Sequence, residues 1–171
     1  ADYVITEAGF GADLGAEKFF NIKCRMAGLT PDAVVVVATV RALKMHGGLD
    51  KKELAKEDID ALEKGIPNLL RHVSNIRNVY KLPCVVAVNR FPTDTDAEID
   101  FIIAKCRELG VNSVLSTEWS EGGKGGQALA REVVRLCEEE KGDFTFAYED
   151  GLSIEEKIEA VVKKVYGGDG I

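Results

Sequence analysis

The sequence predicts a three-layer α/β/α fold around a mostly parallel sheet, and two observations carry this prediction. Short apolar runs occur at residues 33–39, 83–89 and 112–116, and the first two are rich in valine, as in strands that are buried on both faces. Segments with a helical spacing of apolar residues separate and follow these runs. Strands that alternate with helices form right-handed parallel crossovers. The expected topology is therefore P-loop-NTPase-like or Rossmann-like.

The other elements follow from periodicity and from helix-stop signals. Apolar residues recur at helical spacing, as at Ile99, Ile102 and Cys106, and Gly110 closes that segment. Pro67 either kinks the helix that contains it or marks a new start. The expected helices cover residues 16–27, 58–79, 94–109, 125–141 and 154–165. Further short strands are expected at residues 3–6 and 144–148, and a loop or short turn at residues 41–48.

Chain length bears on domain organisation. The chain has 171 residues, which suits a single α/β domain over residues 1–171. It begins almost on a strand and stops in a turn-like segment at residues 167–171. We therefore expect an internal piece of a longer chain, with short natural termini as the alternative. Residues 150–171 could begin a further subdomain.

Charge and composition exclude several classes of partner. With 22 basic and 29 acidic residues, the net charge is −7, which argues against nucleic acid or an anionic membrane surface as the main partner. The longest apolar run, residues 33–38, is too short to cross a membrane. No basic segment precedes an apolar one at the start, so we expect a cytoplasmic protein. The four cysteines include no Cys-x-x-Cys pair and are expected to be reduced and mostly buried.

A glycine-rich turn after the first expected strand is one candidate site. Glu7 ends the apolar segment, and Gly9, Gly11 and Gly15 turn the chain towards a helix. Glycines allow a phosphate to approach the backbone, and a helix N-terminus offers free N–H groups. Glu7 could contact a metal ion or its water shell. The alternative is a tight turn with Glu7 as a surface acid.

Polar and aromatic residues directly follow the second buried strand. The Asn89 amide can donate and accept hydrogen bonds, and the Asp94 carboxylate can accept one from an exocyclic amine. This pair resembles loops that contact a nucleotide base, although the spacing is not that of a guanine signature. Asp94 could instead cap the following helix, with Ala97 at the position that a capping box gives to glutamate.

The loop after the third buried strand contains Trp119, the one tryptophan, in a polar and glycine-rich setting. Phe91 occupies the equivalent loop one unit earlier, and two aromatic side chains on neighbouring loops could clamp a flat heterocycle. The alternative places Trp119 in the core, beneath the loop. Residues 122–126 contain a lysine but lack the Gly-Lys-Ser/Thr of a P-loop, and no other segment supplies it.

Basic residues follow the first buried strand. Arg41, Lys44 and His46 could meet phosphates or a carboxylate at the end of that strand. The alternative is a solvated face that ends at Gly47 and Gly48.

Three long segments, residues 6–19, 37–48 and 89–96, resemble the formate–tetrahydrofolate ligase family, and the similarity runs over essentially the whole chain. The resemblance implies an enzyme that makes formyl phosphate from formate and ATP, then passes the formyl group to tetrahydrofolate. The chain resembles about a third of such an enzyme, from its middle. The family's P-loop lies upstream of the matching part, so we expect the isolated chain to be inactive.

The resemblance also implies roles for single residues. Phe91 and Trp119 would form an aromatic slot for pterin or adenine, which Asn89 would reach, and Phe10 and Gly11 would lie near the folate or formyl phosphate. Further lining residues would be Leu115 and the loop of Gly122, Gly123, Lys124 and Gly125. The family implies ATP with magnesium, tetrahydrofolate, a monovalent cation and a homotetramer. Two other interpretations remain: a non-catalytic nucleotide- or folate-binding module that acts with a partner chain, and a structural domain without a ligand.

Overall fold

A three-stranded parallel sheet forms the centre of the protein in the computed structural model, which describes residues 1–171. The strands are β1 (Val34–Ala38), β2 (Cys84–Asn89) and β3 (Ser113–Ser116), in the spatial order β1-β2-β3. Ala38 pairs with Val88, and Asn89 pairs with Ser116. All three valine-rich or aliphatic runs are therefore strands, as predicted. Burial on both faces is wrong for β1, because Val35 and Val37 are 37% and 65% exposed.

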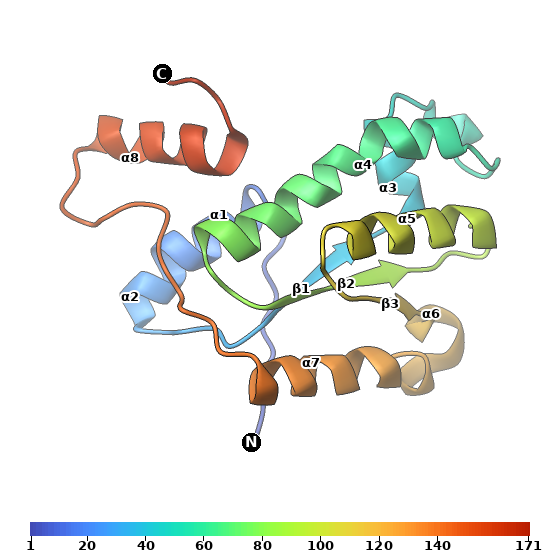
Figure 1. Ribbon diagram of the computed structural model, residues 1–171, viewed down its shortest axis with the longest axis horizontal. Coiled ribbons are helices and arrows are strands. Elements are labelled where there is room, and N and C mark those ends of the chain that lie inside the picture. Colours follow the sequence, from blue (N-terminus) through green and yellow to red (C-terminus); the bar gives the residue numbers. More distant parts are fainter.

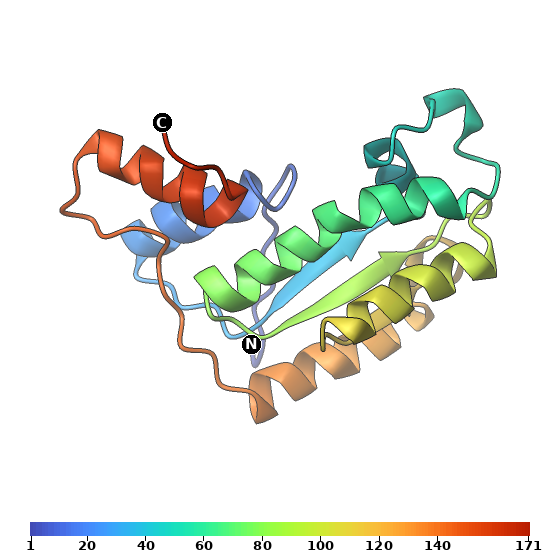
Figure 2. The ribbon, with the colours of Figure 1, turned by 45° about the horizontal axis from the view of Figure 1, so that its top comes forward.

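Helices cover both faces of this sheet. Helices α4 (Ile59–Ser74) and α5 (Asp96–Glu108) lie over one face, and α7 (Gln127–Glu139) lies over the other (Figures 1 and 2). Each helix follows a strand in the chain, so the crossovers are those of an α/β fold. This confirms the predicted class and its three layers.

The remaining helical segments complete the path of the chain. Helix α4 continues through Pro67 without interruption and into the π-helical turn η3 (Asn75–Val79). The others are α1 (Gly15–Lys18), η1 (Phe19–Cys24), α2 (Arg25–Ala27), η2 (Lys51–Glu53), α6 (Glu118–Glu121), η4 (Gly122–Lys124), α8 (Ile154–Val161) and η5 (Val162–Tyr166). No helix is both long enough and apolar enough to span a membrane.

Residues 41–48 differ from the expected loop, because most of them form helix α3 (Val40–His46). The Thr39 side chain caps this helix by accepting a hydrogen bond from the Ala42 N–H at 3.1 Å. The helix buries Val40, Leu43 and Lys44 against the core, so the segment is not a solvated face.

The two short strands expected at the ends of the chain are absent. Residues 3–6 pair with no strand, and Val4 and Ile5 are 83% and 87% exposed. Residues 144–148 form no strand and lie outside the sheet, because their hydrogen bonds go elsewhere. The Thr145 N–H donates to the Tyr80 carbonyl, and the Ala147 N–H donates to the Asn21 side chain. Neither segment therefore has a neighbouring strand in this chain.

The four cysteines are free thiols, as expected. Cys24, Cys84 and Cys106 are buried, and Cys137 is half-buried. Burial raises the pKa of Cys84 and of Cys106 to about 11, which keeps both thiols protonated at neutral pH.

A fully buried ion pair joins the helices that follow β1 and β2. The Lys44 ammonium on α3 lies 2.7 Å from the Glu98 carboxylate on α5, and neither side chain is exposed. Lys44 also donates to the Lys56 carbonyl at 2.7 Å. Glu98 accepts further hydrogen bonds from the N–H groups of Asp58 and Thr95, both at 3.1 Å. The pair therefore fixes the starts of α4 and α5 relative to α3.

The electrostatics of Glu98 follow from these contacts. Burial alone would raise the pKa of Glu98, but the hydrogen bonds from Lys44 and from the two backbone N–H groups hold the net pKa below its usual range. A carboxyl group with a lowered folded-state pKa stabilises the fold above its unfolded pKa. That contribution is lost as pH falls through the folded-state value.

We expect Lys44→Met to destabilise the fold by about 3–5 kcal/mol at pH 7, because it leaves the Glu98 charge buried without its partner. The double variant Lys44→Met/Glu98→Gln restores part of this loss by removing the charge. Urea unfolding measures both. The surface variant Lys56→Met is the control, since Lys56 pairs only with exposed Glu53. Equal, small effects of Lys44→Met and Lys56→Met would contradict the role of the buried pair.

Candidate functional site

The carboxyl ends of the three parallel strands meet at one edge of the sheet, where ligands of α/β proteins bind. The loops after β2 and β3 begin side by side, because Asn89 pairs with Ser116 and the Arg90 N–H donates to the Ser116 carbonyl at 3.1 Å. Helix α3 starts two residues after β1, at the same edge. The expected loops of residues 89–94 and 117–123 are therefore neighbours.

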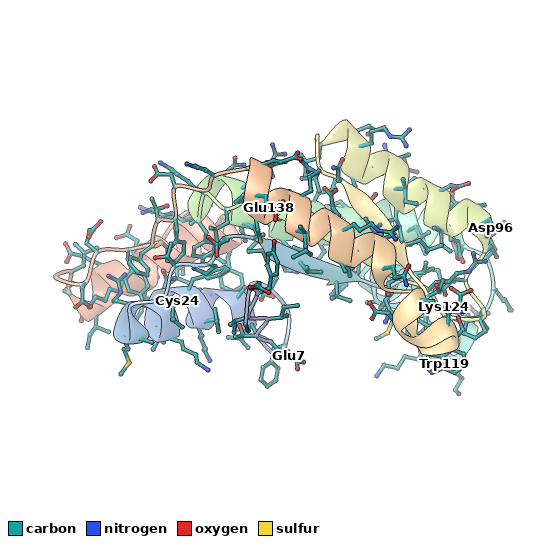
Figure 3. All side chains as sticks on the ribbon, turned by 90° about the horizontal axis from the view of Figure 1, so that it is seen from below. Glu7, Cys24, Asp96, Trp119, Lys124 and Glu138 are labelled. Carbon is teal, nitrogen blue, oxygen red and sulfur yellow. The ribbon has the colours of Figure 1, made fainter.

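The two aromatic residues of these loops differ in exposure. Trp119 lies on α6 and is 73% exposed, so the alternative that placed it in the core is wrong. It projects from one end of the molecule, near Lys124 (Figure 3). Phe91 is half-buried, two residues beyond the end of β2. An exposed indole and a half-buried phenyl ring on adjacent loops offer flat apolar surfaces to a planar ligand.

Arg41 contacts Phe91 from the neighbouring strand end. The Arg41 guanidinium carbon lies 4.9 Å from the centroid of the Phe91 ring. Its Nη2 donates to the Thr93 hydroxyl at 3.1 Å, whereas its Nε is buried without a hydrogen-bond partner. The guanidinium is therefore directed at the Phe91 loop.

Asp94 is buried inside the same loop. Its Oδ2 accepts a hydrogen bond from the Phe91 N–H at 2.8 Å, and its Oδ1 is buried without a partner. Burial raises the pKa of Asp94, and the Phe91 N–H and the charge of Arg41 oppose this rise. Asp94 therefore braces the Phe91 backbone, and with 4% of its surface exposed it does not present its carboxylate to solvent.

The cap of helix α5 lies one residue beyond the expected position. Thr95, not Asp94, caps the helix, and Thr95 and Glu98 form a full capping box. The sequence contained the signal, because a threonine followed three residues later by a glutamate is the capping-box pattern. The expected helix began at Asp94, so Thr95 was taken as a helical residue rather than as the cap.

The other expected lining residues of the edge are accessible to different degrees. Asn89 is half-buried at the end of β2, and its amide makes no hydrogen bond within the chain. Leu115 is half-buried in β3 and packs against the core. Gly122 and Gly123 are exposed, and a Cβ atom at either position would meet open space. Gly122 has a φ of 57°, which favours glycine there.

Four expected site residues lie apart from this edge or are unavailable. Phe10 is 91% exposed, and the turn of Phe10 and Gly11 leads into α1, away from α6 (Figure 1). Exposed Glu7 is also distant from Trp119 (Figure 3). Lys44 is buried in the ion pair with Glu98, so it presents no charge to a phosphate, contrary to expectation.

No group of three or more histidine, cysteine, aspartate or glutamate side chains in this chain could hold a metal ion. Glu7 has no such neighbours, so the residues present do not fit a magnesium site. A cavity of about 390 Å³ has no lining residue from the strand-end loops. Its lining residues are Asp13, His46, Asn68, Arg71, His72, Val165 and Tyr166.

The three-stranded parallel sheet and the helices on both of its faces define a parallel α/β protein. The family model for formate–tetrahydrofolate ligase matches residues 1–171. A curated relative from Methylococcus capsulatus strain Bath, named formate–tetrahydrofolate ligase, is 58% identical over all 171 residues. The chain spans 31% of the length of that relative. The chain therefore belongs to the formate–tetrahydrofolate ligase family.

We expect Asp94→Ala to lower the free energy of unfolding by about 1–3 kcal/mol, because the Phe91 N–H loses its acceptor. Asp94→Asn retains an acceptor and costs less. Burial raises the folded-state pKa of Asp94, so protonated Asp94 favours the folded state below the unfolded pKa, and this stabilisation is lost as pH rises through the folded-state pKa. Because the asparagine side chain does not ionise, the stability of Asp94→Asn relative to the wild type should be more favourable at pH 7 than at pH 4.

Urea unfolding at pH 4 and pH 7 measures these differences. Asp96→Asn is the matched control, because Asp96 is exposed and pairs with Arg90 on the surface. A loss for Asp94→Asn as large as that for Asp94→Ala would show that the hydrogen bond to Phe91 does not brace the loop.

Proposed function

We propose that this chain supplies the heterocycle-binding part of a formate–tetrahydrofolate ligase. The complete reaction converts ATP, formate and tetrahydrofolate into ADP, phosphate and 10-formyltetrahydrofolate. Family membership supports this reaction class for the longer protein. The observation that carries the proposal is the presentation of Phe91 and Trp119 from adjacent strand ends.

In this proposal a planar ring lies against Phe91 and Trp119 at the carboxyl edge of the sheet. Offset stacking on an aromatic face contributes beyond simple burial of apolar area. The free amide of Asn89 donates to or accepts from the edge of the ring. The open space at Gly122 and Gly123 admits the ligand close to the backbone. Asp94 does not contact the ligand but holds the Phe91 loop in place by accepting the Phe91 N–H.

The ring is the adenine of ATP or the pterin of tetrahydrofolate. Both are flat, nitrogen-rich heterocycles with donors and acceptors along one edge, so the same two aromatic side chains suit either. The exposed position of Trp119 makes the choice measurable, because the one indole of the chain is a fluorescent reporter in the proposed slot.

The chemistry at formate and phosphate requires groups that these residues do not supply. Phosphoryl transfer depends on positioning and on charge neutralisation by lysine, metal ion and backbone N–H groups. The sequence holds no P-loop, and Lys44, which was expected to meet a phosphate, is neutralised by Glu98. The role of this part of the enzyme is to bind and orient a ring. In the complete enzyme we propose a homotetramer, as the resemblance implies.

Trp119 fluorescence tests ring binding directly. We expect saturable quenching by ATP or by tetrahydrofolate, and the tighter ligand identifies the ring. Phe91→Leu keeps an apolar side chain but removes one stacking face, so it should weaken the bound ligand roughly 2–10-fold. Phe101→Leu is the matched control, because Phe101 lies on α5.

Free tryptophan serves as the control for absorption by the ligands. A folded chain, by circular dichroism, whose Trp119 shows no saturable response to either ligand would refute the proposed ring site.

We expect the isolated chain to form no 10-formyltetrahydrofolate. With ATP, formate and tetrahydrofolate present, release of ADP should stay at the rate seen without protein, because the phosphate-binding machinery is missing. The full-length Methylococcus capsulatus relative is the positive control. Turnover by the isolated chain would contradict the assignment of a purely ring-binding role.

A further inference from the structure

We propose that Arg41 is a positioning residue that holds the Phe91 ring for a ligand to stack on its opposite face. The proposal rests on the proposed function, because it concerns the same ring site. It assigns to Arg41 a role other than the contact with phosphate or carboxylate that its basic character first suggests.

Two contacts tie Arg41 to the Phe91 loop. The guanidinium lies over the ring at 4.9 Å from the centroid, which is within the range of an attractive cation–π contact. Its Nη2 also donates to the Thr93 hydroxyl at 3.1 Å. Arg41 thus contacts both the ring and the backbone segment that follows it, so the ring and its loop are held from one side.

The helix that carries Arg41 is held firmly in place. Arg41 is the second residue of α3, next to the Thr39 cap, and the buried Lys44–Glu98 pair fixes the same helix. Asp94 restrains the loop from within by accepting the Phe91 N–H. The Phe91 ring therefore lies between a helix-borne cation and a braced backbone, which limits its rotamers before any ligand arrives.

One of the two sides by which the Arg41 guanidinium could hold an anion with two N–H groups is closed. Bidentate recognition uses two N–H groups of the guanidinium fork that face the anion together. Here Nη2 is already bonded to Thr93, and Nε is buried without a partner. The side of the fork that joins these two nitrogens is therefore closed to a ligand. The guanidinium covers one face of the ring, and the proposal assigns the opposite face to the heterocycle.

Arginine is specifically suited to this arrangement. Its planar guanidinium can stack on a ring while it donates in its own plane, whereas a lysine ammonium is a compact point charge. Lysine at this position would retain the charge but would not hold the ring and Thr93 together. The substitution Arg41→Lys therefore separates the effect of the positive charge from the positioning of the Phe91 ring.

The test compares each complete ligand, which carries charged groups, with a ring-only ligand that lacks those groups. Adenosine is compared with ATP, and a pterin without the glutamate tail is compared with tetrahydrofolate, each titrated against Trp119 fluorescence. We expect Arg41→Met to weaken the ring-only ligand and its charged parent by the same factor, roughly 3–10-fold. Arg41→Lys should weaken the binding of both ligands as much as Arg41→Met does. Thr93→Val should also weaken it, but by a smaller factor.

Arg90→Met is the matched control, since it removes a charge of the same sign from the residue next to Phe91, whereas Arg41 lies on α3. Arg90 pairs with exposed Asp96 on the surface, and its removal should leave the affinities unchanged. A spectroscopic readout is independent of affinity. The NMR signals of the Arg41 guanidinium should show a ring-current shift that disappears in Phe91→Leu.

Three results would overturn the proposal. A loss of affinity for ATP or tetrahydrofolate alone, with the ring-only ligand unaffected, would make Arg41 an anion contact. Unchanged affinities in folded Arg41→Met and Thr93→Val would remove its role, and so would the absence of a ring-current shift. Failure of the ring site itself is distinguishable, because the wild-type chain would then bind neither ring-only ligand.

Discussion

The buried pair of Lys44 and Glu98 is the contact on which the arrangement of this protein depends. Two charges without exposed surface require each other, since either one alone would be strongly destabilising. The pair joins α3 to α5, and Glu98 also accepts the Asp58 N–H at the start of α4. The helices after β1 and β2 are thereby fixed relative to each other. The loop between β2 and α5, which carries Phe91, lies within this frame and is closed by Asp94 and Thr95.

Most of the sheet could be predicted because it depends on local patterns. A valine-rich run such as Val34–Ala38 has few alternatives to a strand, although one face of β1 is exposed at Val35 and Val37. Segments of helical periodicity separate the strands. The edges could not be predicted in this way, since residues 3–6 and 144–148 have strand-like composition but no pairing partner. Helix α3 was missed because Gly47 and Gly48 suggested a turn. Its Thr39 cap is a local signal that could have been recognised, whereas the burial of Lys44 depends on Glu98, 54 positions away.

The candidate site shows the same division. Phe91 and Trp119 were identifiable because residues just beyond parallel strands must meet at one edge. The contact of Arg41 with Phe91 joins residues 50 positions apart, and the ion pair of Lys44 with Glu98 joins residues 54 positions apart. No local pattern indicates either contact. Both basic residues looked like anion ligands, but one is buried and the other is packed on a ring. The assignment of Phe10 and Gly11 to the site rests on family resemblance alone. In the structure both residues lie on a separate turn, where Phe10 is exposed.

The central claim is that a heterocycle binds at the carboxyl edge of the sheet, between the loops after β2 and β3. Chemical-shift mapping of the isotope-labelled chain with adenosine, and separately with a pterin, tests it most directly. The account predicts that the largest amide shifts fall in residues 89–94 and 117–123. Shifts concentrated at the cavity beside Arg71 and His72, with residues 89–94 and 117–123 unaffected, would place the ring elsewhere and contradict it.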